Sequence, residues 1–74
     1  MNKQRRKEIQ DVIAKIESVV RLVQGIYDDE QEAFDNMSEG LQMSANGYAS
    51  EEAQEKLEEA IDILEEAISC LEEV

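Results

Sequence analysis

Apolar residues recur along the first half of the chain in alternating steps of four and three, and no proline interrupts them. This heptad spacing places one apolar stripe along a helix. Glu30 fills the single polar slot of the stripe, whose apolar members are Ile9, Ile13, Ile16, Val20, Val23, Tyr27, Phe34, Met37 and Leu41. The pattern predicts a helix from about residue 3 to about residue 35. Gly25 is its weak point, where the helix either packs closely on a neighbour or bends.

The last third of the chain repeats a seven-residue unit, LEEAIDI at 57–63, LEEAISC at 64–70 and LEEV at 71–74. Ser50 is a good N-cap, and Asn46-Gly47 just before it is typical of a turn. We therefore expect a second helix from about residue 50 to about residue 73, preceded by a structured loop at 36–49. The stripe of this helix consists of Ala53, Leu57, Ala60, Leu64, Ala67, Leu71 and Val74.

Both stripes are wider than one partner helix would cover. The residues that widen them are Val12, Val19 and Ile26 in the first helix, and Ile61, Ile63, Ile68 and Cys70 in the second. A helix with so wide an apolar arc should touch at least two neighbours. The sequence thus predicts an all-α single domain, an antiparallel helical hairpin that assembles into a homo-oligomeric helical bundle. The alternative is an extended coiled coil, against which the turn residues at 46 and 47 argue. The predicted oligomer core is Ile9, Ile13, Ile16, Val20, Val23, Leu57, Ile61, Leu64, Ile68 and Leu71.

The chain has 74 residues, too few to bury a large core, so we expect self-association to supply stability. Its single cysteine excludes an intrachain disulfide, and the absence of histidine argues against a zinc site. One free thiol fits a reducing compartment. No leader and no apolar run of membrane-spanning length are evident, so we expect a cytoplasmic location and no membrane partner.

Charge is unevenly distributed along the chain, whose net charge is −12. Residues 1–25 carry six basic and three acidic residues, whereas the remainder carries 16 acidic residues and only Lys56 as a base. One interpretation is that the basic and acidic helices attract each other. The other is that the acidic surface faces a basic partner, including a protein that normally holds nucleic acid. Direct binding of duplex nucleic acid is disfavoured, because most of the surface would repel its backbone.

The residues needed for catalysis are missing. General acid–base chemistry at neutral pH usually draws on histidine, and Cys70 lies on an apolar flank that suits a buried, inert thiol. The three glycines are too scattered for a phosphate loop. The acidic run from Asp28 lacks the glycine that a calcium loop needs at its sixth position, which is Ala33. We expect no enzyme activity, no cofactor and no metal.

The N-terminal NKQRRK, residues 2–7, concentrates four positive charges at the start of the first helix. It is either a solvated helix end or a partner for Glu72 and Glu73 in an antiparallel hairpin. The alternative is an anion site, in which Lys3, Arg5 and Arg6 hold a small anionic nucleotide between subunits, assisted by Tyr27 or Tyr48.

The segment from residue 34 to 48 is the strongest candidate for partner binding. Either Phe34, Met37 and Leu41 fold back to cap the end of the bundle, with Ser38–Gly40 forming one helical turn, or the segment presents methionine and tyrosine to a partner. Both roles are compatible. The candidate partner-binding residues are Phe34, Asn36, Met37, Leu41, Gln42, Met43 and Tyr48.

The stretch EQEAFDNMSEGLQ at 30–42, between a charged first helix and the LEEAI repeats, resembles small acidic helical proteins encoded by phages and mobile elements of Gram-positive bacteria. No activity is assigned to that group, so the resemblance implies provenance. It favours a noncatalytic homo-oligomeric interaction protein that binds or inhibits a host factor, such as a defence protein, through its acidic surface and the 34–48 loop. The alternatives are a sponge for an anionic nucleotide and a purely structural assembly adaptor.

Overall fold

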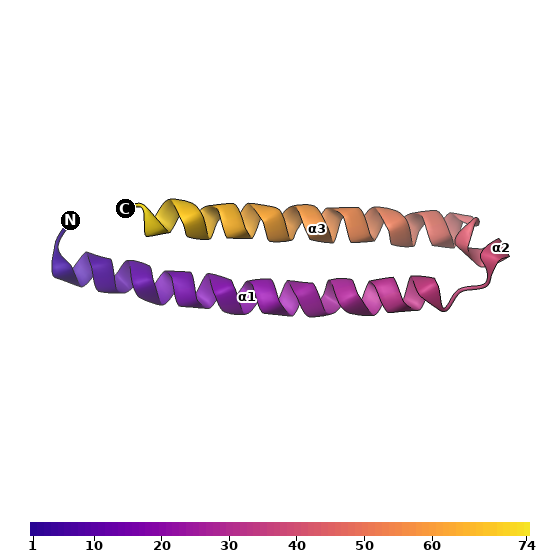
Figure 1. Cartoon of the computed structure of the whole chain (residues 1–74), viewed down its shortest axis with the longest axis horizontal. Helices are drawn as coiled ribbons and strands as arrows, with labels where there is room; N and C mark the ends of the chain where they lie inside the picture. The colour runs from indigo at the N-terminus through magenta and orange to yellow at the C-terminus, as the bar shows by residue number, and fades with distance from the viewer.

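The heptad stripe of the first half forms one uninterrupted helix in the computed structural model of the protein, which describes all residues from 1 to 74. The chain folds into α1 (Lys3–Asp35), α2 (Glu39–Gln42) and α3 (Ala45–Glu72). The two long helices run antiparallel side by side, so the chain termini lie at one end and α2 at the other (Figure 1). The Cα trace measures 58 × 15 × 11 Å along its principal axes. The predicted all-helical hairpin is confirmed.

Helix α1 has the predicted bounds, and its N-terminus is capped by Asn2. The Asn2 side chain accepts a hydrogen bond from the backbone N–H of Arg5 at 2.8 Å, which satisfies one of the free donors of the first turn. Gly25 lies inside the helix, and a Cβ added there would meet no atom within 4 Å. The expected close packing at Gly25 is therefore absent.

The predicted loop at 36–49 is wrong, because α3 begins at Ala45 and not near residue 50. The chain reverses around the short helix α2 instead. Ser38 is the N-cap of α2 and accepts a hydrogen bond from the N–H of Leu41, which confirms the helical turn expected at this position. Ser44 is the N-cap of α3, and its hydroxyl donates to the carbonyl of Leu41. Ser44 thus occupies the N-cap position that was predicted for Ser50, without a side-chain hydrogen bond to the first turn of α3.

The expected Asn46-Gly47 turn is also wrong, because both residues belong to the first turn of α3. Gly47 is buried, and a Cβ there would overlap the backbone of Gln42. The glycine therefore serves a close approach between the start of α3 and the end of α2, and its low helix propensity is tolerated for that reason.

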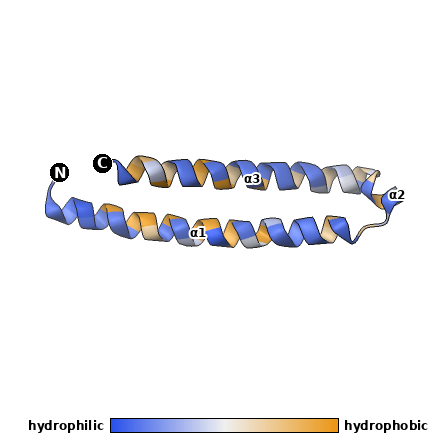
Figure 2. Cartoon of the chain, viewed as in Figure 1, coloured by the Kyte–Doolittle hydropathy of each residue, from blue (hydrophilic) through white to orange (hydrophobic).

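The two predicted stripes face each other along the length of the hairpin (Figure 2). Even so, only Ile13 and Ile61 are fully buried among the apolar residues, and the others of the stripes are at most half-buried. Leu41 and Val74 depart from the prediction, with 43% and 60% exposure, because Leu41 belongs to α2 and Val74 follows the end of α3. The ten residues predicted as an oligomer core lie along the α1–α3 interface of a single chain, and their part in an oligomer stays a prediction.

The two glycines are expected to respond oppositely to alanine. Gly47→Ala should destabilise the fold by about 2 kcal/mol or more, since its methyl group must displace the Gln42 backbone. Gly25→Ala should stabilise it by about 1 kcal/mol, because the new methyl group meets open space and alanine favours the helix. Urea unfolding at one fixed protein concentration measures both. Equal effects of the two substitutions would contradict the close contact at Gly47.

Candidate interaction surface

Two side-chain hydrogen bonds join the long helices. The Tyr27 hydroxyl donates to Oε1 of Glu58 at 2.7 Å, and the Ser50 hydroxyl donates to Oε2 of Glu30 at 2.6 Å. Ser50 is buried, with 5% of its surface exposed. A glutamate is therefore accommodated at position 30 of the apolar stripe because its carboxylate accepts a hydrogen bond from the Ser50 hydroxyl of α3. Such directional bonds fix how far α3 slides along α1, which an apolar stripe alone specifies weakly.

The contact between Tyr27 and Glu58 also changes the acidity of the tyrosine. Its pKa is raised above the ordinary value, first because the phenol donates its proton to Glu58 and then because of partial desolvation. The negative charges of Glu58, Asp28 and Asp35 act in the same direction.

The basic residues of α1 find no acidic partner within the chain. The only ion pair joins Lys56 and Glu59 of α3 at 3.6 Å, and both side chains are exposed. Of the two structural interpretations of the N-terminal basic cluster, the structure agrees with the solvated helix end and not with the pairing to Glu72 and Glu73. Ile9 and Leu71 line the same pocket at the open end of the hairpin, so the first turn of α1 extends beyond the end of α3 (Figure 1). The Arg6 guanidinium instead donates to the carbonyl of Met1 at 3.3 Å.

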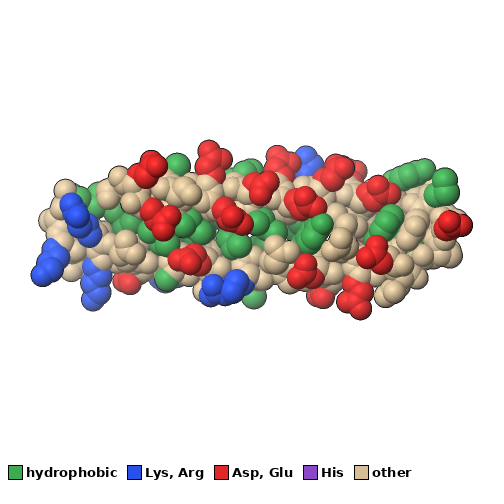
Figure 3. All heavy atoms as spheres, in the orientation of Figure 1, with side chains coloured by type: hydrophobic (Ala, Val, Ile, Leu, Met, Phe, Trp, Pro, Cys, Tyr) green, Lys and Arg blue, Asp and Glu red, His purple; other side chains and the backbone are tan.

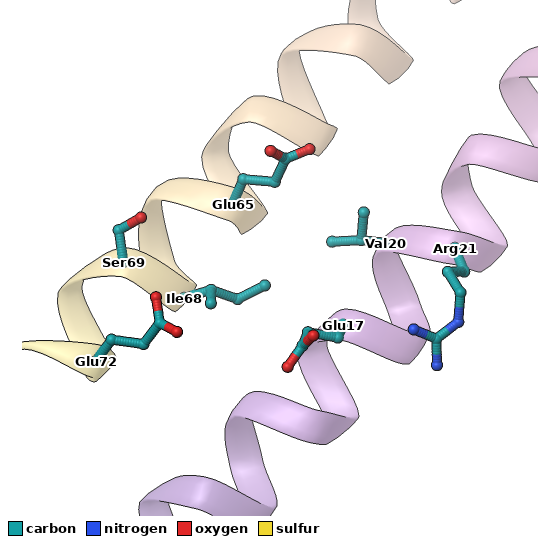
Figure 4. Close-up of a pocket in the computed structure, with 7 residues that line it drawn as sticks. All are labelled: Glu17, Val20, Arg21, Glu65, Ile68, Ser69 and Glu72. Atoms are coloured by element: carbon teal, nitrogen blue, oxygen red, sulfur yellow. The ribbon is translucent and has the colours of Figure 1, made fainter.

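One side of the hairpin is a charged face, which we define by Glu17 and Arg21 of α1 and Glu58, Asp62 and Glu65 of α3. A groove of about 380 Å³ runs along it, and in Figure 4 Val20 and Ile68 point toward each other between the helices. Arg21 points away from α3 in this view. Figure 3 shows acidic side chains along both helices, with apolar side chains in the groove between them. No three His, Cys, Asp or Glu side chains come close enough together to hold a metal ion.

The tip of the hairpin, residues 36–48, is ordered by its own hydrogen bonds. The Gln42 side chain donates to the carbonyl of Phe34 at 2.9 Å, which ties α2 to the end of α1. Among the predicted partner-binding residues, the half-buried ones are Phe34, Met37 and Gln42. The exposed ones are Asn36, Leu41, Met43 and Tyr48, and Met43 and Tyr48 have 72% and 59% of their surface exposed.

The residues of the alternative anion site are not brought together within one chain. Lys3, Arg5 and Arg6 lie in the first turn of α1, at the open end of the hairpin. Tyr27 lies about 33 Å farther along the same helix, at 1.5 Å per residue. Tyr48 belongs to the tip at the opposite end.

Comparison of the chain with protein family models, curated proteins and solved structures returns no match. None of the three helices combines the length and the apolar character required to cross a lipid bilayer.

Sequence reasoning missed one large apolar residue, Leu22, which is 69% exposed. The signal for it was present, because Leu22 lies three residues after Val19 and four before Ile26 and so continues their column along α1.

Sequence reasoning also missed the Ser50–Glu30 bond, since a serine before two glutamates favours a helix cap over an inter-helix contact.

The raised pKa of Tyr27 predicts a specific pH dependence. The hydrogen bond favours the protonated phenol, so its contribution to stability is complete below pH ~10 and is lost as pH rises through the folded-state pKa. Glu58→Gln should return the pKa of Tyr27 toward its ordinary value. Ultraviolet titration in a Tyr48→Phe background, in which Tyr27 is the only tyrosine, measures this change. An unchanged Tyr27 titration in Glu58→Gln would contradict the assigned cause.

Proposed function

We propose that this chain is a noncatalytic, homo-oligomeric interaction protein, of phage or mobile-element origin, that binds a basic surface of a host protein through its tip. By occupying that surface it inhibits the host factor. The partner is thus a protein with a positively charged patch that surrounds an apolar depression.

The observation that carries the proposal is the set of large side chains exposed on an ordered tip. Leu41, Met43 and Tyr48 are exposed on this segment. The segment is ordered by the Ser38 cap, the bond from Ser44 to the Leu41 carbonyl, the glycine contact and the side-chain bond to α1. A surface that is already ordered loses little conformational entropy on binding. Methionine adapts to irregular pockets, and tyrosine contributes large contact area with a polar end.

Charge around the tip supports a basic partner. Gln24 of α1 lies at the level of Ile61 of α3, so residues 24–61 form the tip half of the hairpin. They hold eleven acidic residues and a single base, Lys56, which pairs with Glu59. A field of one sign speeds the approach of an oppositely charged protein and disfavours acidic competitors. The apolar side chains then supply the short-range contacts, and the acidic rim orients the complex.

The proposal predicts loss of binding when the tip is made polar. A tagged protein with Met43→Ser and Tyr48→Ser should fail to retain a host protein that the unmodified protein captures at low salt. In a titration with the purified partner, Tyr48→Ala alone should weaken binding by about 2 kcal/mol, roughly 30-fold, as expected for a buried aromatic anchor.

The matched control is Val74→Ser, which removes an equally exposed apolar side chain at the other end of the molecule. It should bind the partner normally. Binding should also weaken as salt rises, since the charges involved are exposed. If the tip variants and the control captured the same proteins in the same amounts, the tip would not be the binding surface.

A further inference from the structure

A second apolar stripe on α1 is left uncovered in the single hairpin. Its large members are Val12, Val19, Leu22 and Ile26, with exposures of 44%, 43%, 69% and 57%. They are spaced by seven, three and four residues, which is again heptad spacing. One helix therefore carries two stripes, of which α3 covers only the first.

Helix α3 has a matching second stripe. From residue 49 to 70, steps of four and three pass through small or apolar residues, interrupted only by Lys56. At its centre Ile63 is 58% exposed, although glutamate or aspartate occupies many neighbouring positions. Its alanines, such as Ala60 and Ala67, also belong to the stripe that faces α1 and are half-buried, and their small side chains would let another helix approach closely.

Both second stripes lie on the same side of the hairpin. At 3.6 residues per turn, Val19 lies on the flank of α1 opposite to Glu17 and Gln24, which line the grooves of the charged face. In the same way, Ile63 lies on the flank of α3 opposite to Glu58 and Glu65. The side opposite the charged face is therefore an apolar face, which we define by Val12, Val19, Leu22, Ile26, Ile63 and Cys70.

The chain exposes more surface than a compact monomer of its mass, and the excess is close to the area that one interface buries. The single hairpin exposes 5621 Å², whereas a compact monomer of 8.4 kDa is expected to expose about 4,600 Å². The excess of about 1,000 Å² is close to the ~800 Å² that one partner buries in a stable protein interface. Burial of one long side of the hairpin against a second copy would remove an area of this size.

Charge decides the orientation of that second hairpin. The tip half, residues 24–61, carries eleven acidic residues and one base, and the open half carries the other six basic residues with eight acidic ones. Two hairpins with their tips at the same end would bring the two most negative regions together. Opposite orientation places each negative tip half beside the basic residues in the open half of the other copy. These basic residues form no ion pair with an acid of their own chain.

We infer that the apolar face binds the same face of a second copy in antiparallel orientation, forming a four-helix bundle with α1 against α1 and α3 against α3. The inference rests on the self-association in the proposed function and adds the face and the orientation. Val19 and Ile63 lie near the two-fold axis, and Val12 of one copy lies opposite Ile26 of the other. The basic residues 3–7 then lie beside residues 31–35 of the second copy, and the two tips point outward at opposite ends.

Single cysteines test this geometry in a Cys70→Ala background, with a short bis-maleimide linker applied to the otherwise native protein. Val19→Cys alone should give cross-linked dimers of twice 8.4 kDa. Val12→Cys alone and Ile26→Cys alone should give several-fold less, because the two identical positions lie about 21 Å apart along the antiparallel helices. An equal mixture of Val12→Cys and Ile26→Cys should restore the cross-link.

The control is Gln24→Cys, which lies on the charged face and should stay monomeric on the gel. A Val19→Cys protein that fails to cross-link with itself, or that links to Ile63→Cys instead, would overturn the antiparallel arrangement. These outcomes are separate from those of partner binding, since each tip lies at an outer end of the dimer. If the tip variants lose partner capture but keep the cross-link pattern, the result tests partner binding alone. If the cross-link pattern fails while partner capture is unchanged, the result overturns the dimer alone.

Discussion

The structure depends on a thin apolar seam between two long helices. Most residues of the two stripes are half-buried in that seam, and only Ile13 and Ile61 become fully buried among the apolar residues. Two helices side by side shield only the line of contact, and the hydrophobic effect grows with the area removed from water. A hairpin of this kind therefore has a weak core by itself, and its second stripes are the surface from which more burial can come.

Polar contacts and one glycine fix the register of the two long helices and the position of the tip, which the apolar seam alone does not determine. The bonds Ser50–Glu30 and Tyr27–Glu58 set the register of α3 on α1 at two separate levels. Gly47 brings the start of α3 onto the backbone of Gln42, which keeps the tip compact. The molecule that results has two distinct surfaces with exposed apolar side chains. One is the ordered tip with Met43 and Tyr48, and the other is the apolar face along one side. In our account the first serves a partner and the second serves another copy.

The sequence predicted the parts of the fold that periodicity controls. The bounds of α1 and the half-buried stripes followed from heptad spacing, which long helices express strongly. The prediction failed at residues 45–50, because Ser50 and Gly47 have ordinary roles as a cap and a turn residue that tertiary contacts overrode. The sequence also left open whether the N-terminal basic cluster is a solvated helix end or pairs with Glu72 and Glu73, since that geometry depends on the relative lengths of the two helices. For the tip, the sequence indicated the segment, but the division between half-buried Phe34 and exposed Tyr48 required the fold.

The most direct test of the central claim is thermal unfolding of the unmodified protein over a thousandfold range of concentration. If a second copy completes the core, folding and association are linked, and the unfolding midpoint must rise steadily with concentration. Light scattering on the same samples should then give twice the chain mass of 8.4 kDa. A cooperative transition with a midpoint independent of concentration, in a species of single-chain mass, would show that the hairpin is stable alone and would contradict the account.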